Sequence, residues 1–320
     1  MNVLFVTYNR LGDAVLSTGL LAHLLQRHVD IRITVACGPV PAPLFTPMPG
    51  LERLIVLEKA PRLGHWRKLW RETVGRRWDM VIDLRGSAIA WCLLARERHV
   101  ARDREKNRHR VEFLAQVMGL RQPPAPALWA SPAQRQEARR LLPDGRRYLI
   151  LAPTANWGGK CWPADRFAAL AERLTAPQGC LAGARIAVCA GAWERAQAEP
   201  VLQAFPAERR IDLIGGADLP TLYACLERAA LFVGNDSGLM HMAAAAGAPT
   251  LGLFGPSREE LYGPWGPHAA SVRTDRSFLE IRHDPDYDYR RQDSWMLDLG
   301  VDKAVHAAEA LMATVRDSAA

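Results

Sequence analysis

Long apolar runs are missing from this sequence, which limits the cellular locations expected for the chain. No stretch approaches the roughly 18–20 consecutive apolar residues that a membrane-spanning helix needs. The N-terminus, MNVLFVTYNR, has no basic start and only a very short apolar run, so it is expected to form a first strand rather than a signal peptide. These two absences predict a cytoplasmic protein.

Several familiar sequence patterns are also missing. The six cysteines form no CxxC pair and no metal-ligand spacing, so they are expected to be buried or free thiols of a reducing compartment. There is no GxSxG elbow, no RNP-like aromatic segment and no helix-turn-helix. Short-period repeats and low-complexity segments are absent as well. A serine hydrolase, a nucleic-acid-binding module and a repeat protein are therefore all disfavoured.

What is present fits an ordinary globular protein with a basic balance. With 320 residues the chain is longer than one average core requires, so two domains are expected. Forty-one basic and 34 acidic side chains give a formal net charge of +7. This charge favours anionic partners, among which nucleic acid, phosphorylated glycolipids and nucleotide sugars all qualify.

Apolar strands alternate with helices along both halves, which predicts an α/β protein with parallel sheets. In the first half the expected strands are 3–7, 31–36, 54–57 and 80–84, and the expected helices are 14–28, 63–77 and 87–95. In the second half the expected strands are 148–152, 185–190, 211–214, 231–233 and 250–254, and the expected helices are 164–174, 193–204, 219–229, 239–246 and 303–315. Residues 273–295 are expected to be irregular. Because the Pro- and Ala-rich stretch 121–132 interrupts the alternation, we place the domain boundary within 121–147 and predict domains over 1–147 and 148–320.

The stretch 231–256, LFVGNDSGLMHMAAAAGAPTLGLFGP, organises the second half. An apolar strand, a glycine-bearing turn, an Ala-rich helix and a second apolar strand form a βαβ unit. The turn lies at the carboxyl end of its strand, where open α/β sheets bind ligands, and the helix N-terminus that follows suits a phosphate or diphosphate. The alternative is that Asp236 or Ser237 merely caps the helix.

Taken together, NDSGLMHMAAAAGAPTLGLFGPS resembles the C-terminal signature of glycosyltransferase family 9, the bacterial heptosyltransferases. In that family a D-S/T-G-x-x-H turn, a small-residue helix, a G-x-P and a G-x-x-G-P-[ST] ending line the nucleotide-sugar site. The matching residues are Asp236, Ser237, Gly238, His241, Gly247, Pro249, Gly252, Gly255, Pro256 and Ser257. The resemblance implies the GT-B fold, in which an acceptor-binding and a nucleotide-sugar-binding Rossmann-like domain face a central cleft.

The first turn, Arg10-Leu11-Gly12-Asp13, resembles the family's N-terminal R-x-G-D motif. The family often has proline where this chain has Gly19, a departure that leaves the turn intact. The resemblance implies that Gly12 helps to bind substrate and that Asp13 is the catalytic base. A carboxylate at a strand end can take the proton of an attacking acceptor hydroxyl. The alternative is that Asp13 only caps a helix starting at Ala14.

Residues 153–163, PTANWGGKCWP, resemble the family segment that ends in K-x-W-P. Lys160 maps onto the lysine that neutralises the donor diphosphate, where an ammonium stabilises the charge of the leaving group. Thr154 and Asn156 lie where they could donate hydrogen bonds to phosphate or sugar. His241 could face the same turn or be a satisfied core histidine. A lone lysine is otherwise most often a solvated surface residue.

Two other chemistries are weighed and set aside. Asp284, Asp286 and Asp288 alternate in HDPDYDY, but they fall in the irregular stretch and are predicted to form a solvated acidic loop. We therefore predict no metal and no cofactor. Asp236, Ser237 and His241 lie within one turn, so they cannot adopt a hydrolase triad geometry.

The resemblance implies an inverting, metal-independent glycosyltransferase with Asp13 and Lys160 as catalytic residues. Its donor would be ADP-heptose and its acceptor a lipopolysaccharide core, with no nucleic acid partner. One alternative is an enzyme of the same family that uses another nucleotide sugar or acceptor. The other is a non-catalytic, basic nucleotide-binding module.

A basic face in the first half suggests peripheral contact with an anionic inner membrane. Residues 62–78, RLGHWRKLWRETVGRRW, place four apolar side chains along one helical stripe: Leu63, Trp66, Trp70 and Val74. The basic residues of this segment are Arg67, Lys68, Arg71, Arg76 and Arg77. Residues 96–110 add Arg96, Arg98, Arg102, Arg104, Lys106, Arg108 and Arg110. The alternative is that the stripe packs on the sheet while the charges are simply solvated.

Overall fold

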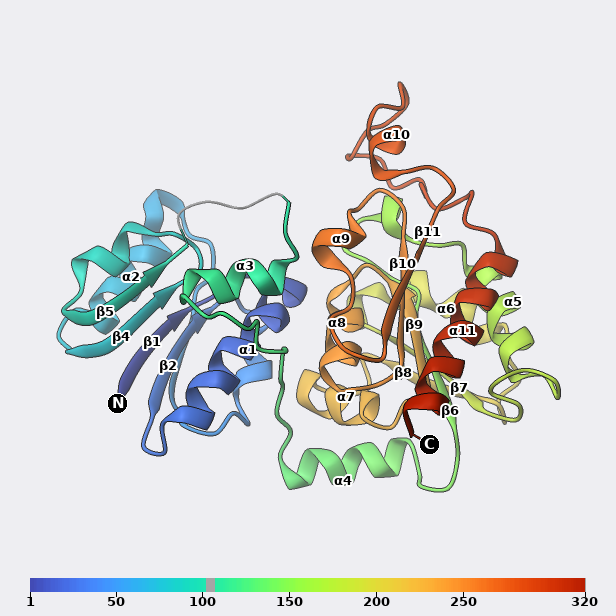
Figure 1. Ribbon diagram of the computed structural model, residues 1–320, viewed down its shortest axis with the longest axis horizontal. Helices are drawn as coiled ribbons and strands as arrows, with labels where there is room; N and C mark the ends of the chain where they lie inside the picture. The colour runs from blue at the N-terminus through green and yellow to red at the C-terminus, as the bar shows by residue number, and fades with distance from the viewer. Residues whose placement is uncertain (102–106, 320) are drawn as a thin grey trace. The chain divides into compact units, whose positions relative to one another are not determined.

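The computed structural model describes residues 1–101 and 107–319 of the chain. The chain divides into two compact units, Met1–Ser131 and Pro132–Ala320, each built on one parallel sheet (Figure 1). Among the described residues, no helix combines the length and the apolar character that crossing a membrane requires. All six cysteines are free thiols, as the sequence predicts.

The first unit has a five-stranded sheet in the order β3-β2-β1-β4-β5. Its strands are β1 (Asn2–Val6), β2 (Arg32–Cys37), β3 (Leu51–Val56), β4 (Trp78–Asp83) and β5 (Ala95–Val100). Its helices are α1 (Leu11–Arg27), α2 (Gly64–Thr73) and α3 (Arg110–Val117), with short 3₁₀ turns η1 (Ala42–Phe45), η2 (Pro61–Leu63) and η3 (Ala88–Cys92). The central strand β1 pairs with β2 and β4, and its apolar run is buried on both faces of the sheet, as parallel architectures require.

The helix that we expected at 87–95 is wrong. The chain there makes only the short turn η3 and then enters the edge strand β5, which pairs in parallel with β4. The sequence of β5, ARERHV, is too charged to read as a buried strand. Charged side chains are nevertheless typical of a sheet edge, because they discourage pairing with another chain.

The second unit has a six-stranded sheet in the order β11-β10-β9-β6-β7-β8 (Figure 1). Its strands are β6 (Tyr148–Ala152), β7 (Arg185–Ala190), β8 (Arg210–Ile214), β9 (Leu231–Asn235), β10 (Thr250–Phe254) and β11 (Ala269–Arg273). Its helices are α4 (Pro132–Leu141), α5 (Ala164–Thr175), α6 (Arg195–Gln203), α7 (Leu219–Leu226), α8 (Gly238–Ala245), α9 (Glu259–Tyr262), α10 (Phe278–Arg282) and α11 (Val301–Ala319), with 3₁₀ turns η4 (Gly158–Lys160) and η5 (Ala192–Glu194). Helices α5, α6 and α11 cover one face of the sheet, and their apolar side chains form the main core with it (Figure 1).

The domain limit that we expected at 147 lies too far along the chain. The two units divide between Ser131 and Pro132, inside the expected boundary region, so that α4 belongs to the second unit. This helix packs against α7, and Arg135 of α4 forms an ion pair with Glu227 at 2.8 Å. Side-chain contacts with the second unit, which local sequence does not reveal, therefore decide where α4 belongs.

Both sheets are wound in the same way, and this winding positions the polar turns. In the first sheet the chain runs outward from β1 to β3 and returns to place β4 beside β1. In the second it runs outward from β6 to β8 and returns to place β9 beside β6. Open α/β sheets bind ligands at the carboxyl ends of the two strands where the winding reverses. The loop after β6 and the turn after β9 lie at that point of the second sheet, and the turn after β1 lies at that of the first.

Candidate functional site

The centre of the candidate site is an ion pair between the loop after β6 and the turn after β9. Lys160 Nζ lies 2.5 Å from Asp236 Oδ2. The carboxylate side chain is 8% exposed and that of the lysine 23%, so one charge is buried while the other still reaches solvent. Burial raises the pKa of Asp236, but the charges of Lys160 and His241 and hydrogen bonds from Lys160 and Ser257 outweigh it and leave that pKa below its ordinary value. The site therefore holds a fixed negative charge that orients an accessible ammonium.

Asn235, the last residue of β9, fastens the loop after β6 at both of its ends. Its Nδ2 donates to the carbonyl of Pro153 at 2.7 Å, and its Oδ1 accepts the backbone N–H of Trp162 at 3.1 Å. The side chain is fully buried. Because the loop between Pro153 and Trp162 contains Lys160, this amide fixes the position of the loop relative to Asp236.

The segment 291–295 holds the middle of the same loop. Trp157 Nε1 donates to the carbonyl of Arg291 at 2.6 Å, and the backbone N–H of Gly158 donates to Gln292 Oε1 at 2.8 Å. A Cβ atom on Gly158 would lie 2.2 Å from the Gln292 carbonyl oxygen, so only glycine fits there. The GGK sequence is thus explained by close backbone packing just before the lysine.

The N-terminus of α8 supplies further groups that suit an anion. Ser237 occupies the N-cap position, but its side chain makes no capping hydrogen bond. Its Oγ is buried and has no hydrogen-bond partner among the described residues. The first N–H groups of a helix also lack internal partners and carry partial positive charge. The helix-cap interpretation therefore fails for Ser237, and the turn remains available to a phosphate.

Glu194 is a site residue that the sequence reasoning missed. It lies in η5, after β7, and its Oε2 accepts the hydroxyl of Thr154 at 3.1 Å and the N–H of Gly191 at 2.8 Å. Thr154 itself is 2% exposed. The signal that could have found Glu194 is its place just beyond an apolar strand, at the same edge of the sheet as the other polar turns. The carboxylate extends the site from β6 to the neighbouring strand β7.

The remaining residues predicted for this site differ in their surroundings. Asn156 is exposed at the surface of the loop, so its contact with a substrate stays a prediction. His241 is 4% exposed and lies inside α8, yet it is near enough to Asp236 to lower the pKa of that carboxyl group. It is therefore a buried histidine that also acts electrostatically on the site.

The turn after β1 is shorter than expected. Helix α1 begins at Leu11, so Gly12 is helical and Asp13 lies in the first turn of the helix instead of capping one that starts at Ala14. The N-cap position belongs to Arg10, and its side chain makes no capping bond. The Asp13 carboxylate is partly exposed and forms no hydrogen bond or ion pair with any described residue. Its side chain is therefore not needed to start the helix.

With this geometry in place, comparison with known proteins identifies the family. Residues 85–286, more than half of the chain, match the model of glycosyltransferase family 9 (heptosyltransferase). The chain belongs to this family. The matched range contains Lys160, Asp236 and His241 but begins after Asp13.

Individual members of family 9 are also similar to this chain. Lipooligosaccharide heptosyltransferase 2 of Haemophilus influenzae is 32% identical over 158 residues, which cover 46% of this chain and 44% of the relative. The chain spans less than half the length of the first curated relatives that it matches. Among solved structures, the family 9 glycosyl transferase of Veillonella parvula is similar with a TM-score of 0.81 at 22% identity, over 97% of each chain. The Escherichia coli ADP-heptose lps heptosyltransferase II follows with 0.76 at 20%, over 99% of this chain and 100% of the other. These likenesses confirm the predicted GT-B fold with two Rossmann-like domains.

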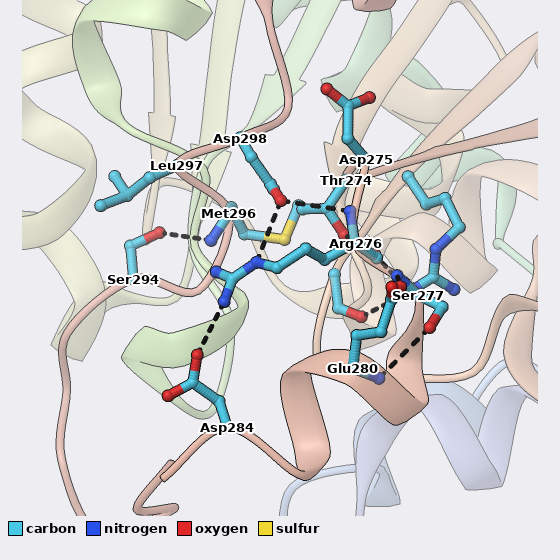
Figure 2. Close-up of polar contacts among 12 residues, drawn as sticks. Thr274, Asp275, Arg276, Ser277, Glu280, Asp284, Ser294, Met296, Leu297 and Asp298 are labelled. Carbon is cyan, nitrogen blue, oxygen red and sulfur yellow. Dashed lines mark hydrogen bonds and ion pairs between the residues drawn. The ribbon is translucent and has the colours of Figure 1, made fainter. Parts of the chain in front are cut away.

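The acidic stretch after α10 is not simply solvated, which corrects one prediction. Figure 2 shows Arg276 between two carboxylates, with Nη1 2.9 Å from Asp284 Oδ2 and Nε 3.2 Å from Asp298 Oδ2. Asp284 is thus partly buried and ion-paired, which ties this stretch to the chain on either side of it. In the parts of the chain that the structure describes, no three His, Cys, Asp or Glu residues gather as metal ligands. Independence from metal stays a prediction.

The basic face of the first unit also differs from expectation. Leu69 is the buried apolar residue of α2, Trp66 and Val74 pack beside it, and Leu63 and Trp70 are 65% and 43% exposed. The predicted stripe is therefore split between core and surface. Further apolar exposure comes from η3, which packs against α2, and from the second residue after it: Trp91 is 56% and Leu94 65% exposed.

Two of the four basic residues that the structure describes in segment 96–110 are not available as outward charge. Arg98 donates three hydrogen bonds to backbone carbonyls around η3. Arg110 is 6% exposed, with its guanidinium over the rings of Tyr8 and Phe113. Three further residues lie outside the described part of the chain: Arg102, Arg104 and Lys106. The exposed basic residues of α2 and the exposed Arg77, Arg96 and Arg108 carry what remains of the predicted face among the described residues.

Proposed function

We propose that this chain is an inverting glycosyltransferase that moves a heptose from ADP-heptose to a lipopolysaccharide core acceptor. The observation that carries the proposal is the Lys160–Asp236 pair, held at the reversal point of the second sheet beside the open N-terminus of α8. A cation, an unpartnered Ser237 hydroxyl and free helical N–H groups together suit a diphosphate. Membership of family 9 and the fold shared with an ADP-heptose lps heptosyltransferase support the sugar and its nucleotide.

The donor would lie along the carboxyl edge of the second sheet. Its diphosphate would take the Lys160 ammonium, while Asp236 keeps that ammonium from moving with the substrate. Glu194, in η5 just beyond the next strand β7, would accept hydrogen bonds from ribose hydroxyls, a common role for an acidic residue in Rossmann-like units. As the diphosphate leaves, its growing negative charge meets donors that are already in position, which lowers the barrier.

In the proposed reaction, the group that takes the proton of the acceptor hydroxyl belongs to the first unit. The acceptor hydroxyl oxygen forms a bond to the anomeric carbon, and the bond between that carbon and the diphosphate oxygen breaks with its electron pair leaving on ADP. The Asp13 carboxylate takes the hydroxyl proton. Attack on the face opposite to the leaving group inverts the anomeric configuration. Lys160 and the α8 dipole supply the positive charge for which other enzymes use a metal ion.

Binding and product formation test the proposal separately. Calorimetry with ADP, UDP and GDP should give the tightest binding for ADP. Incubation with ADP-heptose and a heptose-deficient core acceptor, in EDTA, should raise the acceptor mass by one heptose. A preference for UDP or GDP would favour the same reaction on another nucleotide sugar. ADP binding without any transfer to core acceptors would leave the non-catalytic nucleotide-binding alternative.

The acceptor is a glycolipid, so we extend the proposal to docking on an anionic membrane surface. Four exposed apolar side chains define a docking patch on α2, η3 and the residues that flank them: Leu63, Trp70, Trp91 and Leu94. Arg67, Lys68 and Arg71 of α2 are exposed on the same elements. Tryptophan beside arginine and lysine is typical of segments that lie in a membrane interface.

A further inference from the structure

Trp193 is the most exposed of the large aromatic side chains at the carboxyl edge of the second sheet. It follows β7 in η5, and 79% of its surface is accessible to solvent. A single exposed apolar residue needs no explanation by itself. The position of Trp193 does require an explanation, because the next residue is Glu194, which accepts a hydrogen bond from Thr154 at the candidate site.

The backbone beneath the indole is shaped to receive it. A Cβ atom on Gly191 would lie 2.9 Å from both Cε2 and Cζ2 of Trp193, so the ring rests directly against a glycine. The next strand also comes close, since a Cβ on Gly215, after β8, would lie 2.6 Å from the Cβ of Ala192. Because neither Gly191 nor Gly215 has a side chain, the residues of η5 can pack closely against the backbone at both positions. The indole therefore packs against the backbone at Gly191, while most of its surface stays accessible to solvent.

The order of the strands sets the distance from this indole to the diphosphate groups. Along the sheet edge, β9 precedes Asp236 and Ser237, β6 precedes Lys160, and β7 precedes Trp193 (Figure 1). Two strand spacings separate β9 from β7, about 10 Å. A nucleoside diphosphate whose phosphates lie at β9 and whose ribose meets Glu194 places its base over β7.

We propose that Trp193 is the stacking platform for the nucleobase of the donor, and that its wide indole face favours a purine. This inference rests on the proposed function, because it assumes that the Lys160 site binds a nucleoside diphosphate. Every base has a π face, and stacking on an aromatic side chain is worth binding energy without any base-edge hydrogen bond. The larger ring system of a purine covers more of the indole than a pyrimidine does.

Equilibrium binding of ADP, UDP and pyrophosphate to four proteins tests the proposal. Trp193→Ala should bind ADP about 5- to 100-fold more weakly than wild type, with a smaller loss for UDP. Its affinity for pyrophosphate should be unchanged, because pyrophosphate has no base to stack. Trp193→Phe should regain most of the ADP affinity. Tyr289→Ala is the matched control, since it removes another exposed aromatic ring, 62% accessible, from the same unit.

The outcomes separate this inference from the function on which it rests. Equal ADP affinity in wild type and Trp193→Ala overturns the stacking role while leaving the diphosphate site intact. An equal loss for ADP and pyrophosphate also overturns it, because Trp193 would then only support the loop. If wild type binds neither ADP nor UDP, the proposed function and this inference fail together. ADP should also quench the emission of wild type, and that quenching should largely disappear in Trp193→Phe.

Discussion

The ammonium of Lys160 lies 2.5 Å from Oδ2 of Asp236, and each of these charges depends on the other. The carboxylate is the more buried partner, so removing the lysine leaves a negative charge with little solvent to stabilise it. The same lysine is assigned to the donor diphosphate. Its structural and functional roles must therefore be separated by experiment.

A pair of variants makes that separation. Lys160→Met should lower the free energy of unfolding by about 1–3 kcal/mol, because an uncompensated charge remains in a partly buried site. Adding Asp236→Asn should restore most of that stability and yet leave ADP binding about 10- to 100-fold weaker than in wild type. Chemical denaturation and calorimetry measure the two quantities.

Lys303→Met is the matched control for this pair. Lys303 lies in the same unit and forms an ion pair of similar length, 2.7 Å, with Asp275, but both side chains are well exposed. Exposed pairs contribute little, so this variant should change neither stability nor ADP binding. Unchanged ADP affinity in the double variant would remove Lys160 from the donor site.

The pH dependence of stability should report the same pair. The folded pKa of Asp236 is lowered, so the unfolded chain binds the proton more readily than the folded one. The stabilisation is present above the unfolded pKa, near 3.8, and is lost as pH falls through the folded value. In Lys160→Met the burial that raises the pKa of Asp236 is less opposed, so the folded pKa should move towards or above the unfolded value, and the loss of stability on acidification should shrink or reverse. Unfolding curves between about pH 3 and pH 7 would contradict this assignment if both proteins lost stability over the same range.

Replacing Asn235 should lower both stability and ADP affinity, because its amide makes two hydrogen bonds to the Lys160 loop. Asn235→Ala leaves the buried N–H of Trp162 and the carbonyl of Pro153 unsatisfied, which should cost about 2–4 kcal/mol of stability. Asn235→Asp keeps an acceptor for the N–H of Trp162 but cannot donate to Pro153. Both variants should weaken ADP binding. The exposed Asn156→Ala should leave the melting temperature unchanged, and equal melting of all three variants with wild type would refute the bracing role.

How far the sequence could predict this site depends on how local each contact is. Asp236 and Lys160 were recognised because each lies in a motif that directly follows an apolar strand. Glu194 and Asn235 act through partners 40 and 73 or more residues away, so nothing in their own neighbourhood indicates those bonds. The edge strand β5 was mistaken for a helix for a related reason, since its pairing with β4 decides its conformation. The alternation of strands and helices, in contrast, follows from local hydrophobic periodicity, and this periodicity predicts a parallel sheet in each half of the chain.

Asp13 should affect turnover and not binding. As the general base it should contribute roughly 10²–10⁴-fold to kcat, so Asp13→Asn should lose that factor while keeping ADP affinity and melting temperature. Asp165→Asn is a suitable control, because Asp165 also lies in the first turn of a helix, α5, and interacts in the same way with a helix dipole. Near-normal turnover of folded Asp13→Asn would reduce this carboxylate to a helix-terminus charge.

The last prediction concerns the docking patch on the first unit. Vesicles rich in phosphatidylglycerol should co-sediment the wild-type protein at low salt and release much of it at high salt, because the attraction to anionic headgroups is screened. Each basic group near such a surface is worth about 1 kcal/mol, so changing Arg67, Lys68 and Arg71 to Glu should weaken binding by about two orders of magnitude or more.

The apolar part of the patch requires its own variant. Trp70→Ala with Trp91→Ala should reduce binding even at high salt, since these side chains act through burial in the interface and not through charge. Trp193→Ala is the control, because it removes an even more exposed indole from the other unit and should leave vesicle binding unchanged. If neither the charge reversal nor the double tryptophan variant changes co-sedimentation, the patch does not dock on membrane. The basic residues of α2 would then be solvated charges, as the alternative interpretation of this helix holds.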